Sequence, residues 1–152
     1  MTTLFAEEPL RGTSGANPAA IERAIRTVLA GESLLVRVPA HVGARAEVDL
    51  TYRVRCVVWR GRDASRLNEV VKVEWYPGGG VPLPKLRASV ESDWNDDGTV
   101  RVLRLEGGYE PPGGELGHAF DVELGHRIAE ASAHDFLRRI AGELSAAKVN
   151  DV

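Results

Sequence analysis

The most constraining feature of this sequence is a long helical pattern between Glu115 and Leu144, close to the end of the chain. Small and apolar residues recur there at every third or fourth position, as they do along the buried face of an amphipathic helix. One helix over this range would be about 45 Å long. A rod of that length needs a broad surface to pack on, so the rest of the chain is expected to supply one.

The predicted buried face of this helix has small residues in its first half and bulky residues in its second. Its members are Ala119, Val122, His126, Ala129, Ala133, Phe136, Leu137, Ile140 and Leu144. A helix that meets a sheet through alanines leaves space unless large side chains of the sheet fill it, and such space is how a ligand pocket arises. The sequence alone does not decide whether Tyr52, Trp75 and Trp94 fill it.

A second apolar row lies on another side of the same helix, in its N-terminal half. It consists of Leu116, Phe120, Leu124 and Ile128. Two apolar rows mean that this half of the helix is covered twice. The second cover is either the Gly/Pro loops and the N-terminal arm, or a partner subunit, which leaves a homodimer open.

Ahead of the helix, the apolar period changes from 3.6 to 2, which indicates β-strands. The predicted strands are 34–38, 48–59, 70–76, 86–94 and 99–106. Asp97-Gly98 is a strong hairpin signal that pairs the last two strands antiparallel. Before the strands, Asn17 and Pro18 are typical of an N-cap and a first helical residue, which predicts a short helix over 18–30.

Strands grouped together and flanked by helices predict an α+β fold, with the helices on one face of an antiparallel sheet. The chain has 152 residues, of which 43% are hydrophobic, and this is enough for one globular domain with its own core. We assign 17–147 to that domain. Residues 1–16 are expected to form a loose arm with at most a short strand over 2–6, and residues 148–152 a disordered tail.

Charge and hydropathy exclude two classes of partner. The net charge is −3 and the arginines are interleaved with acids, so nucleic acid is not an expected partner. The apolar runs are too short for a transmembrane segment, and residues 1–16 lack the order of a secretory signal, which predicts a cytoplasmic protein.

The single cysteine, Cys56, sits in an apolar strand pattern that is typical of a core residue rather than a reactive thiol.

Several segments together resemble bacterial members of the START-like superfamily, also called SRPBCC, which includes polyketide cyclases and the birch-pollen-allergen type. They are EWYPGGGVPLPKLRASVE at 74–91 with the hairpin after it, YEPPGGELG at 109–117, Ala119 and Asp121, RIA at 127–129 and FLRRIAGEL at 136–144. The resemblance implies a helix-grip fold, in which a curved antiparallel sheet wraps around a long C-terminal helix after one or two short N-terminal helices. It also implies a cavity for lipids, polyketides, sterol-like or other apolar ligands.

The predicted cavity lies between the sheet and the C-terminal helix. Its candidate lining residues are Tyr52, Val54, Cys56, Val73, Trp75, Ala88, Val90, Leu103, Tyr109, Val122, His126, Ala129, Ala133 and Phe136. His126, Tyr109 and Arg87 are candidates for orienting a ligand. His126 either touches the ligand or is a hydrogen-bonded structural histidine, and Tyr109 either points into the pocket or anchors the corner where it lies.

No metal, cofactor or catalytic residue is predicted. His118, His126 and His134 recur every eight residues, and each step turns the helix by about 80°, so they do not converge on one metal ion. His126, Glu130 and His134 form an i, i+4, i+8 row, which is typical of ion pairs and less often of a proton relay.

We therefore expect a binding or carrier protein for an apolar small molecule such as a lipid or a polyketide, without catalysis. One alternative is an enzyme of the polyketide cyclase or dehydratase type, which needs at least two convergent titratable groups with displaced pKa values in the pocket. A second alternative is an interaction module that dimerises through the C-terminal helix.

Overall fold

The structure is a computed structural model. It describes the backbone of residues 2–11, 16–29, 31, 33–42, 46–62, 68–77, 85–110 and 122–150, and their side chains apart from those of 35–52, 122–125 and 147–150. The elements within these ranges are β1 (Thr2–Pro9), α1 (Pro18–Val28), β2 (Ser33–Val42), β3 (Ala46–Arg62), β4 (Glu69–Pro77), β5 (Lys85–Trp94), β6 (Arg101–Glu110) and α3 (Val122–Asn150).

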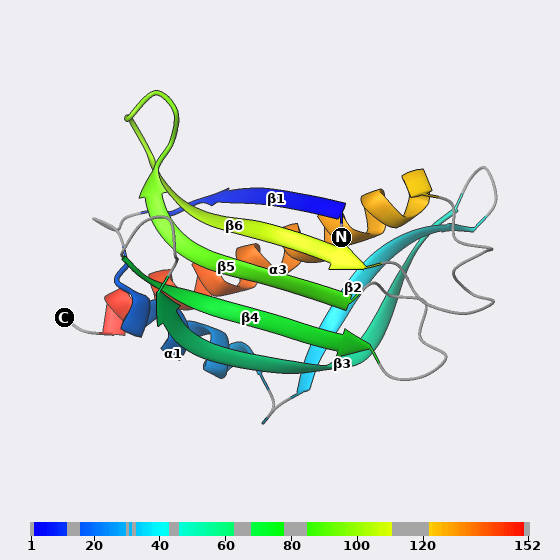
Figure 1. Ribbon diagram of the computed structural model, residues 1–152, viewed down its shortest axis with the longest axis horizontal. Coiled ribbons are helices and arrows are strands. Elements are labelled where there is room, and N and C mark those ends of the chain that lie inside the picture. The colour runs from blue at the N-terminus through cyan, green and yellow to red at the C-terminus, as the bar shows by residue number, and fades with distance from the viewer. Residues whose placement is uncertain are drawn as a thin grey trace.

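The strands form one six-stranded sheet in the order β1-β6-β5-β4-β3-β2, and every neighbouring pair is antiparallel. Helix α3 contacts both edge strands, β1 and β2, which is geometrically feasible only because the sheet curls around the helix. Helix α1 packs against α3 and the middle strands. The sheet is thus a half-barrel with α3 running across its inner face, as Figure 1 shows. The predicted α+β helix-grip fold is confirmed.

The core follows from the alternation within the strands. Every second residue points to the inner face of the sheet, where α1 and α3 lie, and these inward side chains are buried: Val54, Cys56, Val58, Val71, Val73, Trp75, Leu86, Ala88, Val90, Leu103, Leu105 and Tyr109. The predicted face of α3 meets them with Ala129, Ala133, Phe136, Leu137, Ile140 and Leu144, which are also buried. Trp75 and Phe136 form an edge-to-face pair with their ring centroids 5.5 Å apart, a favourable geometry for two aromatic rings.

Helix α1 begins as the sequence predicts. The Asn17 side chain accepts a hydrogen bond from the Ala20 N–H at 2.8 Å, and Pro18 stands at the first helical position, where a missing N–H costs nothing. The helix ends at Val28, two residues earlier than expected, because Leu29 is already extended. Its buried residues, including Ile21 and Ile25, close one side of the core.

The edge strands are longer than the sequence indicates. Strand β1 runs to Pro9 and pairs with β6 over its whole length, so the first half of the predicted loose arm belongs to the sheet. Its inward residues Leu4 and Ala6 are buried, which stabilises the pairing. Strand β2 continues through Pro39 to Val42, because proline is tolerated in an edge strand.

Helix α3 extends to Asn150, so residues 148–150, which were assigned to a disordered tail, are helical. The predicted start of the helix at Glu115 lies outside the described residues, and so do Leu116, Ala119 and Phe120. Within the described residues, no helix is both long enough and apolar enough to cross a membrane.

Gly107 is a point where the curled sheet leaves no room for a side chain. It faces Ala88 of β5, and a methyl group at Gly107 would collide with the backbone of Arg87 and Ala88. We expect Gly107→Ala to lower the free energy of unfolding by about 1–3 kcal/mol through overpacking, measured by urea denaturation.

Two matched glycines control for the change of residue type. A methyl group on Gly61 would meet side-chain atoms only at an ordinary 3.6 Å, so Gly61→Ala should change stability by less than about 0.5 kcal/mol. Gly142 lies exposed within α3 with nothing near its Cβ position, so Gly142→Ala should stabilise the protein by about 0.5–1 kcal/mol. Equal effects at all three positions would contradict a tight strand contact at Gly107.

Candidate functional site

A chain of three polar side chains connects the inner face of the sheet with the surface of α3. The Tyr109 hydroxyl lies 3.1 Å from His126 Nδ1, and His126 Nε2 lies 2.9 Å from Glu130 Oε1. Tyr109 is only 3% exposed, whereas the side chains of His126 and Glu130 are 43% and 54% exposed. The chain therefore runs from the buried sheet to solvent.

Local sequence explains how these three residues meet. Leu103, Leu105 and Gly107 precede Tyr109 with period 2 on the inward side of β6, so Tyr109 also points inward, opposite Leu86 of β5. On α3, His126 and Glu130 are one turn apart and lie on the same side of the helix. Tyr109 and His126 were predicted as site candidates, but the bond between them was not predictable, because it depends on where α3 crosses β6.

The hydrogen-bond pattern fixes what the imidazole can do. When His126 is neutral, the Glu130 carboxylate favours the proton on Nε2, and Nδ1 then accepts the hydrogen bond from the Tyr109 hydroxyl. When His126 is protonated, Nδ1–H donates to the tyrosine oxygen instead, and the hydroxyl proton of Tyr109 can be donated to another acceptor. The chain can thus present Tyr109 as a donor to a bound molecule.

Most of the other predicted lining residues form solid core. Tyr52 and Val122 have no described side chain. Each of the following exposes at most 4% of its surface: Val54, Cys56, Val73, Trp75, Ala88, Val90, Leu103, Ala129, Ala133 and Phe136. An enclosed cavity wide enough for water would expose its lining, so these side chains pack against one another. That any of them also touches a ligand stays a prediction.

Coverage of the α3 face decreases towards its N-terminus. Ala129 and Ala133 are completely buried, but His126, one turn before Ala129 on the same face, has 43% of its side chain exposed. Trp75 lies against Phe136 and therefore fills the bulky half of the interface. Trp94 does not reach the interface, because it is 48% exposed at the end of β5 beneath the Arg101 guanidinium.

Arg87 was predicted to orient a ligand, and this prediction is wrong. Strand alternation places Arg87 on the outer face of the sheet, opposite Gly108 and Glu74. Its Nε lies 2.6 Å from Glu74 Oε1, and its side chain is 60% exposed. The charge that was expected beside the cavity therefore belongs to the solvent-facing side.

The predicted row of ion pairs along α3 divides in two. His126 pairs with Glu130, but His134 Nε2 lies 3.2 Å from Glu8 of β1 and takes no part in a relay with Glu130. Asp135 and Arg139 pair at 3.1 Å, as their i, i+4 spacing predicts. His118 and Asp121 lie outside the described residues.

The contact between Glu8 and His134 was not predicted from the sequence. Glu8 lies in a segment that was expected to be loose, and only the pairing of β1 with β6 brings it to α3. The signal was the alternation of Leu4, Ala6 and Glu8, which places all three on the inward side of one strand. In the part of the chain that the structure describes, no group of three or more His, Cys, Asp or Glu residues could hold a metal ion.

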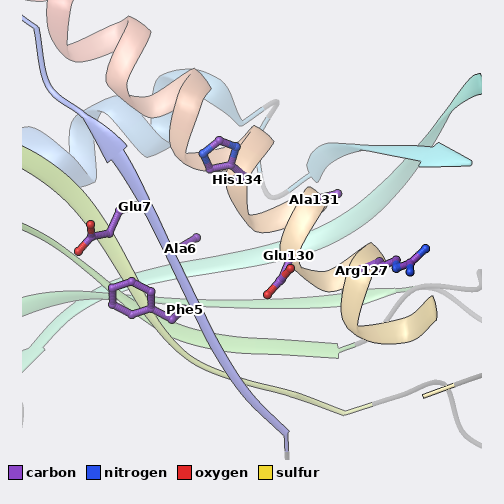
Figure 2. Close-up of a pocket in the computed structure, with 7 residues that line it drawn as sticks. All are labelled: Phe5, Ala6, Glu7, Arg127, Glu130, Ala131 and His134. Carbon is purple, nitrogen blue, oxygen red and sulfur yellow. The ribbon is translucent and has the colours of Figure 1, made fainter. Parts of the chain in front are cut away.

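A surface groove of about 530 Å³ adjoins the outer end of the polar chain. It lies between β1 and α3 and is lined by Phe5, Ala6, Glu7, Arg127, Glu130, Ala131 and His134. Figure 2 shows Phe5 and Glu7 on the side of β1 away from the helix, and Ala6 towards it. Glu130 belongs both to this groove and to the chain that begins at Tyr109.

Comparison with known proteins supports the fold and names no activity. No protein-family model matches the chain, and no curated protein matches it. Among solved structures, the protein TTHA0849 from Thermus thermophilus is similar, with a TM-score of 0.50 and 19% identity over 95% of this chain and 98% of that chain. Such a likeness shows a shared fold, with both chains covered almost completely.

Cys56 is predicted to be chemically inert in the folded protein. It is buried on β3, and burial raises the pKa of its thiol from 9.0 to about 12. At pH 8 this lowers the thiolate fraction about a thousandfold, so alkylation by iodoacetamide should occur only on unfolding. Mass spectrometry of the labelled native and urea-unfolded protein measures this, and rapid labelling of the native protein would contradict it.

Proposed function

We propose that this protein binds a small apolar molecule carrying one polar group, at the end of the helix–sheet core where Tyr109 and His126 meet. The observation that carries the proposal is the buried Tyr109 hydroxyl held by His126. A hydroxyl buried on an apolar face is costly unless it is paired, so it is a specific feature of this site. A few placed polar groups among apolar walls are what orients a ligand in a pocket.

Burial along α3 favours this location over the rest of the interface. From Ala129 onward the inward face of the helix is completely covered, and exposure begins at His126. The guest would place its polar group at the tyrosine hydroxyl and its apolar body beside His126, where the cover of the helix opens. The resemblance to the START-like superfamily supports an apolar guest, of the lipid or polyketide kind.

Two probes that differ by one hydroxyl test the role of Tyr109. Wild-type protein is expected to bind both 2-naphthol and naphthalene, measured by their intrinsic fluorescence. Tyr109→Phe should weaken 2-naphthol binding by about threefold to tenfold, the loss of one hydrogen bond, and leave naphthalene binding within about twofold.

Tyr76→Phe is the matched control, because Tyr76 lies on the outer face, where its hydroxyl bonds to Glu74. It should change neither affinity. If wild-type protein binds neither probe, and native mass spectrometry of the purified protein finds no apolar compound released on unfolding, the binding function is refuted. Equal weakening of both probes by Tyr109→Phe would refute the polar anchor alone.

The order of groups in the polar chain favours a second candidate, an enzyme that moves a proton. If the Tyr109 hydroxyl turns to the oxygen of a bound ketone, it stabilises the enolate, and Nδ1 of neutral His126 is then available for the proton removed from carbon. Glu130 would stabilise the imidazolium that results. This arrangement brings two titratable groups, Tyr109 and His126, together.

Deuterium exchange separates the two candidates. In D₂O, an enzyme of this kind should accelerate exchange of the C1 protons of 2-tetralone, measured by NMR, and His126→Gln should abolish the acceleration. A binding protein should take up 2-tetralone without accelerating exchange. Acceleration that survives His126→Gln would exclude the assignment of His126 as the base.

A further inference from the structure

Strand β1 forms one edge of the sheet, and its hydrogen-bonding pattern can be read from two contacts. The Leu10 N–H donates to the Arg101 carbonyl at 2.9 Å, in continuation of the β1–β6 register. Residues opposite each other in an antiparallel pair alternate between bonded and non-bonded pairs. The backbone N–H and C=O groups of the even residues of β1, such as Leu4 and Ala6, are therefore hydrogen-bonded to β6.

The pattern at the other side of β6 agrees. The Asn95 N–H donates to the Val100 carbonyl at 2.8 Å, in continuation of the β5–β6 register. The backbone N–H and C=O groups of the even residues of β6 therefore point towards β5, and those of the odd residues point towards β1. The backbone groups of Thr3, Phe5 and Glu7 consequently point away from the sheet. Pro9, which has no N–H to offer, falls in the same outward set.

Among the described residues, this edge is open along the groove between β1 and α3. Within the described chain, no hydrogen bond to the outward amides of Thr3, Phe5 or Glu7 is present. The groove of about 530 Å³ lies beside Phe5, Ala6 and Glu7, with α3 as its other wall (Figure 2). Phe5 is 52% exposed on the outer face. A sheet edge whose outward amides have no partner within the described residues, and which carries an exposed aromatic side chain, is a template for another strand.

We propose that β1 pairs antiparallel with β1 of a second copy of this chain, in a register centred on Phe5, so that two sheets join across a twofold axis. The sequence TTLFAEE over 2–8 is complementary to itself in that register. Thr3 lies opposite Glu7 of the second copy, and Thr2 lies opposite Glu8. Every acidic residue thus faces a threonine, and no like charges are opposed.

Registers shifted towards the C-terminal end of β1 are less favourable. A register centred on Glu7 places two carboxylates opposite each other, and one centred on Ala6 brings Pro9 into the new ladder, where its donor is missing. The register on Phe5 uses all outward amides of Thr3, Phe5 and Glu7 and places the two exposed phenylalanine side chains next to each other. Glu7 is already fixed on the outer face by Arg104, whose Nε lies 2.9 Å away.

This inference does not rest on the proposed ligand site, and hydrogen exchange of the wild-type protein tests it without a mutation. In the dimer, the amides of Phe5 and Glu7 should be protected like those of Leu4 and Ala6. In a monomer, the odd amides exchange rapidly while the even ones stay protected. Analytical ultracentrifugation over a concentration series should show a dimer, with protection of the odd amides rising as the dimer forms.

A pair of variants isolates the backbone contribution. Phe5→Ala keeps the outward N–H and Phe5→Pro removes it, and neither changes a bond to β6. Both should therefore have similar stability, but Phe5→Pro should dimerise at least about tenfold more weakly than Phe5→Ala. A wild-type monomer at all concentrations overturns the proposal. Protection of the odd amides in a monomer would also overturn it, because another segment would then cover the edge. A dimer whose affinity Phe5→Pro leaves unchanged would overturn it as well.

Discussion

The packing of α3 against the inner face of the curled sheet is the interaction on which the rest of the structure depends. The helix contacts both edge strands, so the curvature of the sheet and the position of the helix determine each other. Phe136 and Trp75 fix the bulky half of this interface by an edge-to-face contact. Gly107 permits the close approach of β5 and β6 that the curvature requires. The position of His126 over the end of β6 follows from this packing.

The same packing separates a filled half of the interface from a half where exposure begins. From the sequence, the alanines at 129 and 133 could either leave a gap or be covered by large side chains of the sheet. Small side chains also let the helix lie closer to the sheet, and in the structure both alanines are fully buried. One turn earlier, the half-exposed His126 meets the buried Tyr109 hydroxyl. The Tyr109–His126 pair therefore lies at the boundary between solid core and surface.

Much of the fold could be predicted from the sequence. Period-2 alternation located the inward residues of β3 to β6, the Asp-Gly turn paired β5 with β6, and helical spacing identified the buried face of α3. Strand β1 was underestimated because its pattern is short and polar at Glu7 and Glu8, and only the pairing with β6 stabilises it.

The site was predicted as separate residues and not as an arrangement. Tyr109 and His126 were both candidates, but the bond between them depends on where helix α3 crosses β6, and residue periodicity does not specify that crossing. Arg87 was assigned to the wrong face of the sheet. Its neighbours Leu86 and Ala88 are buried on the inner face, so strand alternation points Arg87 to the outer face. Applying strand parity to the sequence alone would have placed it correctly.

The most direct test of a ligand site at Tyr109 and His126 is NMR of the histidine side-chain nitrogens during titration with 2-naphthol. His134 lies on α3 two turns from His126 and bonds to Glu8, which makes it an internal reference. We expect the Nδ1 signal of His126 to shift as the ligand engages Tyr109, while both nitrogen signals of His134 stay unchanged. Saturable binding of 2-naphthol with no change at His126 Nδ1 would contradict this site.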